Sequence, residues 1–308
     1  MIRFADVVVW MAALLAAGWV EAQVQFPLAP SAGAAGADDY PPCQILDKAG
    51  GSQYALSLGY VAESRLKDYE KTSLIELQGT WEFAYYRDVL LADVDLRLDG
   101  GVTLMDAGGV DLPDQVLALA VNGGITWRYV NNTALQLRAR PGIYSDLSAL
   151  DADSLYVPFS GSLIWAVHPE LSGLVGVEVR PGFERSVLPL ARLEWEASAD
   201  WRVSAGFPRS RVTYYGLRDC ALYGGLDWRS DTFSLDDSGE VDREQLTFED
   251  FRLYGGLAYS VSAELQVIGE AGMAFDRSIE FEKAPEDQRR DIDIASDLFV
   301  RVGVVGPF

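Results

Sequence analysis

Apolar and polar residues alternate over long stretches of this chain. In 73–86, the odd positions from Ile75 to Tyr85 are apolar or small, and the even positions from Glu76 to Glu82 are polar. The same alternation returns in 133–139, 173–183, 189–197 and 263–275. A period of two places each set on one face of a β-strand, whereas a helix would repeat every 3.6 residues. The pattern therefore predicts an all-β protein.

The length of these runs favours a membrane barrel over a soluble fold. Soluble strands cluster around 5–6 residues, whereas about 9–11 tilted residues cross a bilayer. Charges lie deep inside the runs, which suits a wet or ion-paired lumen because an isolated charge in a dry core costs several kcal/mol. In lipid every backbone group needs a partner within the chain, so the sheet must close. We therefore expect a single closed antiparallel transmembrane β-barrel, with a secreted soluble β-sandwich as the alternative.

Connection lengths set the strand count. Outer-membrane barrels have short periplasmic turns and longer outside loops. Short connections occur near 130–132, 169–170, 198–200 and 260, and longer polar ones near 63–72, 105–115, 144–154, 234–246 and 277–290. The rule predicts about fourteen strands with both termini in the periplasm. The alternation is weakest in 92–104 and 210–217, and the loss of one hairpin that contains either strand would leave twelve. The fourteen are 52–62, 73–86, 92–104, 116–130, 132–143, 155–167, 171–183, 188–197, 200–207, 210–217, 220–233, 247–260, 262–276 and 291–306.

The two ends of the chain indicate export. Residues 1–22 are typical of a cleaved signal peptide, with a short apolar run and a small-residue cut site before Gln23; an uncleaved anchor is the alternative. Residues 23–51 are predicted to be an irregular periplasmic linker, and 52–308 the outer-membrane barrel. The last strand alternates into a terminal aromatic, Phe308, which resembles the C-terminal signal that the barrel-assembly machinery recognises. Pro307 departs from that pattern because it lacks a backbone donor.

A family resemblance rests on these features together. The signal peptide, the proline-rich lead, the meandering strands and the segment Gly206-Phe207-Pro208 before Tyr214 resemble uncharacterised outer-membrane β-barrel proteins of planctomycetes and related bacteria, a domain-of-unknown-function type. The resemblance covers roughly 52–308. It implies an outer-membrane barrel and no assigned activity.

Composition narrows the function classes. The chain has 308 residues, 25 basic against 46 acidic, a net charge of −21, one histidine and two cysteines. This balance argues against a nucleic-acid partner, and the few histidines and cysteines argue against a metal centre. His168 lies in a turn motif without a serine placed beside it, so we expect no enzyme and no cofactor.

Paired charges are predicted to face the lumen. Arginine pairs bidentately with carboxylates, so such residues would form either a rigid ion-pair network or a charged constriction that selects solutes. These lumen residues are Glu76, Glu82, Arg138, Arg140, Glu178, Arg180, Arg192, Glu194, Glu196 and Arg202. Acidic residues are concentrated in the outside loops and would favour cations over anions. These are Asp146, Asp151, Asp153, Asp231, Asp236, Asp237, Glu240, Asp242, Glu286 and Asp287.

The two cysteines, Cys43 and Cys220, are both predicted on the oxidising periplasmic side, where a disulfide can persist. Two unrelated thiols are the alternative, because sequence separation gives no geometry.

The function expected from the whole sequence is porin-like passive passage of a small-molecule or cation solute through an outer-membrane barrel. The alternative is a closed structural or surface-interaction barrel. The expected partners are outer-membrane lipids and the barrel-assembly machinery, with no nucleic acid.

Overall fold

A computed structural model describes residues 53–65, 71–89, 92–107, 112–129, 132–146, 154–235, 245–262, 265–282 and 290–307. The predicted signal peptide (1–22), the predicted linker (23–51) and Phe308 lie outside the described residues. The strands are β1 (Gln53–Arg65), β2 (Lys71–Val89), β3 (Ala92–Ala107), β4 (Gln115–Tyr129), β5 (Thr133–Ala139), β6 (Gly142–Ser145), β7 (Leu155–Tyr156), β8 (Phe159–His168), β9 (Leu171–Val179), β10 (Val187–Ser198), β11 (Trp201–Phe207), β12 (Arg209–Leu217), β13 (Cys220–Ser234), β14 (Gln245–Ser260), β15 (Gln266–Glu282), β16 (Arg290–Ile294) and β17 (Asp297–Pro307).

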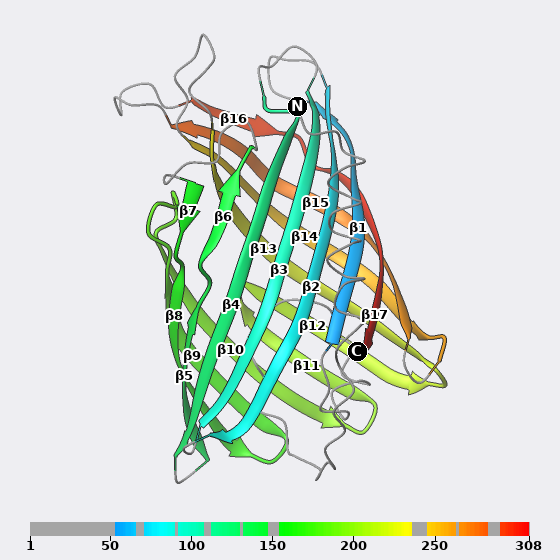
Figure 1. The fold of residues 1–308 in the computed structure, drawn as a ribbon. Helices are drawn as coiled ribbons and strands as arrows, with labels where there is room; N and C mark the ends of the chain where they lie inside the picture. Colours follow the sequence, from blue (N-terminus) through cyan, green and yellow to red (C-terminus); the bar gives the residue numbers. More distant parts are fainter. Residues whose placement is uncertain are drawn as a thin grey trace.

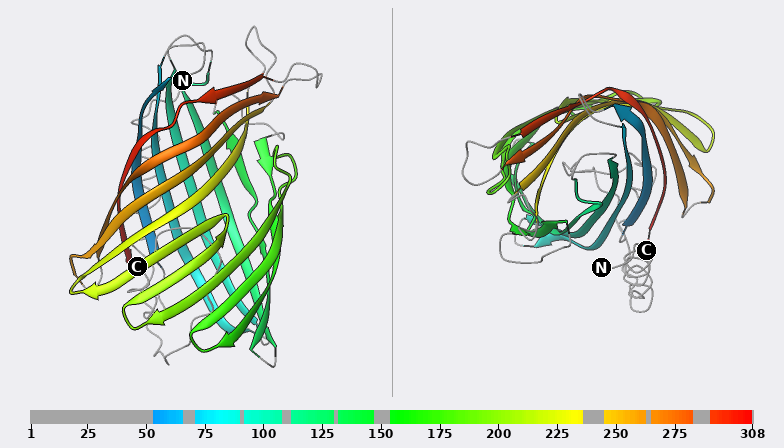
Figure 2. Two further views of the ribbon diagram at one scale, coloured as in Figure 1. Left: turned by 180° about the vertical axis from the view of Figure 1, so that it is seen from behind. Right: turned by 90° about the horizontal axis from the view of Figure 1, so that it is seen from above.

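All of these segments belong to one sheet that closes on itself as a barrel (Figures 1 and 2). β1 pairs with β2 on one edge and with β17 on the other, and Gln53 lies opposite both Glu82 and Pro307. Three pairs of segments are single interrupted strands, because β5 and β6 both pair with β4, β7 continues into β8, and β16 and β17 both pair with β15. The described chain therefore forms the fourteen-stranded antiparallel barrel predicted from the alternation. The soluble sandwich and the twelve-strand alternative are wrong.

The interruptions and one strand end differ from the prediction. Pro141 and Pro158 lie two residues after the ends of β5 and β7, and proline removes a donor from the ladder. The predicted strand 171–183 is too long, since β9 ends at Val179. Pro181 and Gly182 follow, and Gly182 has a φ of 82°, which turns the chain out of the strand.

The two ends of the barrel differ in the length of their connections. At one end, which we call the short-turn end, consecutive strands are joined by two to five residues, and Gln53 and Pro307 lie there. At the other, the long-loop end, most connections are longer. Pro208 is the exception, because it alone joins β11 to β12 at this end.

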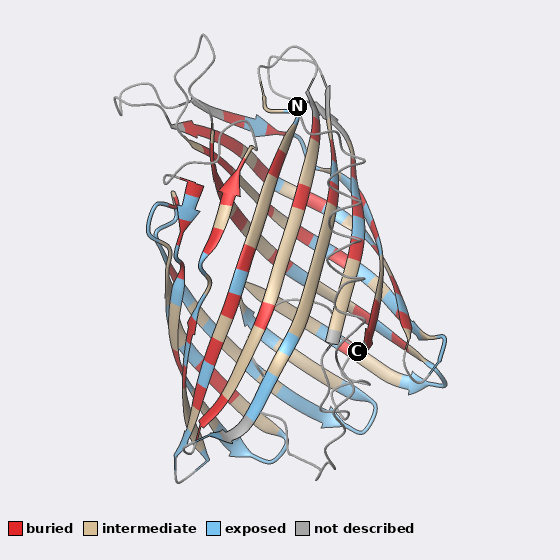
Figure 3. Ribbon diagram, viewed as in Figure 1, coloured by how far each residue is buried: buried red, intermediate tan, exposed pale blue. Residues whose placement is uncertain are grey.

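Side chains are distributed inside out relative to a soluble protein. Outward positions are apolar and exposed, for example Leu137, Leu193 and Leu253, while Glu76 and Arg252 on inward positions are buried. Figure 3 shows buried and exposed residues interspersed along the strands. An apolar outer surface around a polar interior is the arrangement of a barrel that faces lipid.

Aromatic residues mark the borders of the apolar band. Around the short-turn end the outward aromatics are Tyr86, Trp127, Tyr129, Trp165, Trp195, Trp201, Tyr214 and Tyr259. Toward the long-loop end, Phe207 packs on Trp228 at 5.2 Å between ring centroids, and Phe251 stacks on Phe275 at 5.7 Å. Beyond these pairs the outward residues are polar, since Ser230, Glu249 and Ser278 follow on the same face. Aromatic girdles of this kind lie at membrane–water interfaces, so β13 to β15 continue past the apolar band.

Candidate functional site

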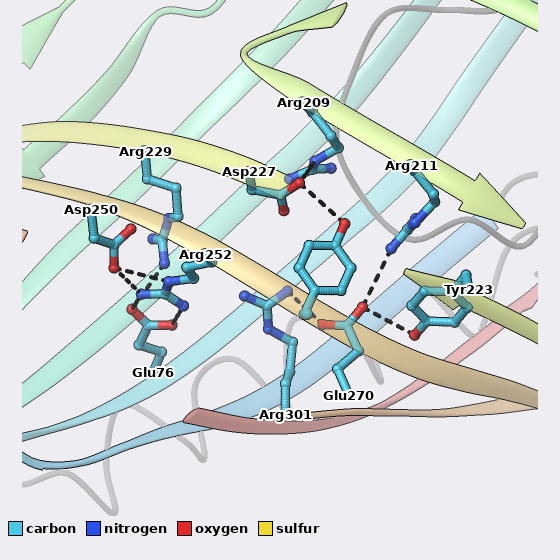
Figure 4. A network of polar contacts seen from close by, with 11 residues as sticks. Glu76, Arg209, Arg211, Tyr223, Asp227, Arg229, Asp250, Arg252, Glu270 and Arg301 are labelled. Atoms are coloured by element: carbon cyan, nitrogen blue, oxygen red, sulfur yellow. Dashed lines mark hydrogen bonds and ion pairs between the residues drawn. The ribbon is translucent and has the colours of Figure 1, made fainter. Parts of the chain in front are cut away.

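An ion-pair network centred on Glu76 crosses the lumen. Glu76 on β2 accepts two hydrogen bonds from Arg252 of β14, both 2.6 Å, and one of 2.9 Å from Arg229 of β13 (Figure 4). Asp250 binds the same Arg252 at 2.8 and 2.9 Å, and Asp231 binds Arg229 at 3.3 Å. β1, β15 and β17 separate β2 from β14 along the sheet. These bonds therefore join walls that are not neighbours in the barrel.

A second carboxylate, Glu270 of β15, holds three further strands together. Arg301 of β17 donates to Glu270 at 3.0 Å, Tyr223 of β13 donates at 3.0 Å, and Arg211 of β12 lies 3.4 Å away. The Arg211 guanidinium also lies 4.4 Å from the centre of the Tyr223 ring. Bidentate and charge-assisted bonds of this kind fix side-chain geometry more strongly than neutral ones. This wall of the lumen is rigid and packed.

Asp227 on β13 extends the same packed wall. It accepts hydrogen bonds from Arg209 at 2.9 Å and from Tyr254 at 3.1 Å (Figure 4). The Tyr254 ring packs edge-on against Tyr223 and Phe299, with centroids 6.4 and 6.5 Å apart. The inward face of β12 to β17 thus combines paired charges with aromatic rings.

The long-loop end of the lumen is filled by apolar side chains, which we call the plug. Its members face inward from the long-loop ends of their strands and are buried: Val61, Leu74, Met105, Val116, Phe233, Leu246, Ile279 and Phe281. Close-packed apolar interiors exclude water. A small cavity of about 30 Å³ lies where the plug meets the first network, and Leu74, Glu76, Arg252 and Glu249 are among its lining residues.

The wall formed by β3 to β5 carries its own ion pairs. Arg138 donates to Asp95 at 2.6 and 3.3 Å and to Asn122 at 3.1 and 3.3 Å, and Arg128 is paired with Asp93. Arg138 is buried. These bonds join strands that are close neighbours and stiffen the wall.

The wall formed by β9 to β11 carries ion pairs whose side chains are all partly exposed. Arg192 and Glu194 lie 3.8 Å apart, each with 21% of its side chain exposed, and Ser204 donates to Glu194 at 2.8 Å. Arg202 pairs with Glu196, whose side chain is 53% exposed. In the described part of the chain these four charged side chains bind one another and Ser204, and none reaches the opposite wall. We call them the exposed ladder.

The ten predicted lumen residues do not form one cluster. Glu76 joins the network across the lumen, Arg138 belongs to the β3–β5 wall, and Glu178 binds Arg180 at 2.7 Å. The exposed ladder accounts for Arg192, Glu194, Glu196 and Arg202. Glu82 is half-buried on β2, and Arg140 lies 5.9 Å above the Tyr144 ring.

Sequence reasoning missed four charged residues of the two lumen networks. Arg229, Arg252, Glu270 and Arg301 share the inward face with Tyr and Phe, which hides the polar alternation. One feature of the sequence could have identified such residues. In the run of alternate positions Phe248, Asp250, Arg252 and Tyr254, two opposite charges occur two residues apart among aromatic residues. Asp231 was predicted in an outside loop, which is wrong. It lies on β13 and pairs with Arg229, because β13 continues past the apolar band.

Other sequence candidates lie away from the lumen. His168 ends β8 at a short turn, where its Nδ1 accepts a 3.5 Å bond from the Glu170 backbone. Cys220 carries a free thiol at the short-turn end, and Cys43 lies outside the described residues, so their disulfide stays a prediction. No group of ligands suited to a metal ion occurs in the described ranges. Those ranges also contain no helix long and apolar enough to cross a membrane.

Comparisons with known proteins give distant structural matches. An outer-membrane channel from Pseudomonas putida F1 is 11% identical, with a TM-score of 0.47 over 88% of this chain and 100% of that one. The P. putida toluene transporter TodX is 9% identical, with a TM-score of 0.40 over 87% of this chain and 92% of that one. The KdgM porin is 10% identical, with a TM-score of 0.34 over 82% of this chain and 99% of that one. No family model and no curated protein matches the chain. The resemblance to the planctomycete-type family therefore stays a prediction.

Proposed function

We propose that this protein is an outer-membrane channel for passive passage of small solutes. The observation that carries the proposal is the asymmetry of the lumen. On the β12–β17 wall Arg252, Glu270 and Arg301 are buried in ion pairs, whereas the exposed ladder on β9 to β11 keeps Glu194 and Glu196 in contact with solvent. A barrel that served only as a structural element would gain stability by packing this wall as well.

The orientation follows from the connections. Short turns at one end and longer loops at the other are the usual arrangement of an outer-membrane barrel, with the short turns in the periplasm. The proposal therefore places Gln53 and Pro307 at the periplasmic end. The signal peptide, recognition by the barrel-assembly machinery through Phe308, and contact with outer-membrane lipids belong to the same proposal.

The test is the ion selectivity of single channels in planar bilayers across a KCl gradient. Glu194→Gln removes a partly exposed lumen carboxylate, and we expect the reversal potential to shift away from cation preference. Asp95→Asn is the matched control, because it also removes one inward carboxylate from an arginine pair, but on the β3–β5 wall. Equal shifts in both variants would show that the ladder does not line the path.

A closed structural barrel is the second candidate, and the plug favours it. If the wild-type protein inserts into bilayers and gives no conductance steps, the channel proposal fails and the closed barrel replaces it.

A further inference from the structure

The barrel wall lacks two strands near its long-loop end. β12 pairs with β13 only as far as Asp227, and β11 pairs with β10 only from Ala191. The Trp228 backbone N–H still donates to the Pro208 carbonyl at 2.9 Å. Above this level 187–190 of β10 pair with β9 alone, while 229–233 of β13 pair with β14 alone. At 3.3 Å per residue, these five residues of β13 span about 16 Å. In the left view of Figure 2 the β11–β12 hairpin ends at mid-height, below the ends of its neighbours.

Strand pairing resumes only above this interval. Ser234, the last residue of β13, pairs with Ser145 of β6, and the Asp146 backbone N–H donates to the Ser234 carbonyl at 3.2 Å. The interval is therefore bounded by the β11–β12 hairpin at one end and by the β6–β13 bridge at the other. It is an opening in the strand ladder within the side of the barrel, and we call it the side portal.

One turn lies across the side portal. Residues 180–186, which we call the latch, connect β9 to β10. Arg180 donates to the Ser230 carbonyl at 2.8 Å, the Glu184 backbone N–H donates to Thr232 at 3.3 Å, and Arg185 binds Glu249 at 2.7 Å. These contacts bind the latch to β13 and β14 where β12 is missing.

An aromatic socket seats the latch from the inside. The Phe183 ring is buried, with its centroid 5.2 Å from that of Tyr144 and 5.1 Å from that of Tyr156. Besides this ring, polar bonds from Arg180, Glu184 and Arg185 to β13 and β14 hold the latch. Such bonds contribute less than a continuous strand ladder, so the latch can open without separating paired strands.

The surroundings of the side portal indicate what could use it. The plug fills the lumen with buried apolar side chains at the same end of the barrel. The outward residues at this level, Ser230, Thr232 and Glu249, are polar and lie beyond the Phe207–Trp228 pair. The side portal thus opens into the aqueous or headgroup layer rather than into the apolar band, and Glu249 lines both the internal cavity and the latch contact.

We propose that solutes cross this barrel through the side portal, with the latch as its gate, and that these solutes are small, polar and water-soluble. The proposal rests on the channel function proposed above and deepens it. The path follows the exposed ladder on β9 to β11 and leaves the barrel beside the plug.

The experiment locks the latch with a disulfide. Glu184→Cys and Thr232→Cys are combined in a background with Cys43→Ser and Cys220→Ser, and mass mapping establishes complete oxidation. We expect KCl conductance to fall at least tenfold on oxidation and to return with a reductant. A Thr126→Cys and Gln136→Cys pair, which joins the already paired β4 and β5, is the control and should conduct equally in both states.

Each outcome decides between the two proposals. Conductance that is unchanged by a complete latch disulfide overturns the side portal and leaves the channel function standing. No conductance in the reduced protein overturns both. Phe183→Ala provides a second measurement that needs no disulfide, since it empties the aromatic socket and should raise the open probability. An unchanged open probability in that variant also contradicts the gate.

Discussion

Replacing Glu76 with alanine tests whether the network across the lumen stabilises the barrel. The change leaves Arg252 and Arg229 without their shared carboxylate, and their side chains are 3% and 19% exposed. Breaking a buried ion pair costs about 3–5 kcal/mol because one charge stays buried and uncompensated. Here Asp250 and Asp231 still neutralise the two guanidinium groups, so we expect a loss of about 3 kcal/mol, at the lower end of that range.

The measurement is urea unfolding of the folded barrel in detergent or lipid vesicles, followed by tryptophan fluorescence. Glu196→Ala is the control, since it removes a lumen carboxylate whose side chain is 53% exposed in its pair with Arg202. An exposed pair contributes only about 0–1 kcal/mol. If Glu76→Ala and Glu196→Ala lose the same free energy of unfolding, the bonds across the lumen do not stabilise the barrel and the reasoning is wrong.

Three further predictions test other parts of the structure. Leu253→Arg places a charge on an outward position within the apolar band. Unfolding in lipid vesicles should show that the free energy of unfolding falls by up to about 2–4 kcal/mol. An unchanged free energy of unfolding would mean that this face does not contact lipid. Gly182→Ala should make the latch more sensitive to limited proteolysis, because φ is 82° and an added Cβ would lie 2.4 Å from the Tyr156 ring; unchanged cleavage would contradict this strain. A Cys43–Cys220 disulfide should shift migration on non-reducing gels, and two free thiols in periplasmically matured protein would refute it.

The strands could be predicted because lipid lies on one face of the sheet and a polar lumen on the other. Apolar and polar residues therefore alternate with a period of two along each strand. Ile75 and Glu76 lie on the outward and inward faces as their parity indicates, and β3 and β12, the weakest members of the pattern, are present. The latch was missed because the apolar alternation continues to Phe183, although Pro181 and Gly182 interrupt the backbone. Alternation reports which face a side chain occupies, and says nothing of backbone breaks.

The interior was predicted less well for a physical reason. Glu76 and Arg252 are 176 residues apart and belong to walls that are not paired, and strand order alone does not tell which walls meet across a lumen. The plug was missed because Phe233 and Leu246 are apolar residues on the inward face. A dry inner surface and a lipid-facing outer surface select the same residue types, so the sequence pattern cannot distinguish them.

The pairing of β1 with β17 has a consequence for how the barrel forms. Apart from the single β6–β13 bridge, the other described strands pair with neighbours that are close in the chain, whereas this seam joins Gln53 to Pro307. Contacts between distant residues pay the largest loop-closure entropy and form slowly. Until the seam closes, two long edges with unsatisfied backbone groups are exposed, and such edges recruit other chains. Closure of the seam is therefore the step at which assembly and aggregation compete, and a chaperone that covers either edge would act there.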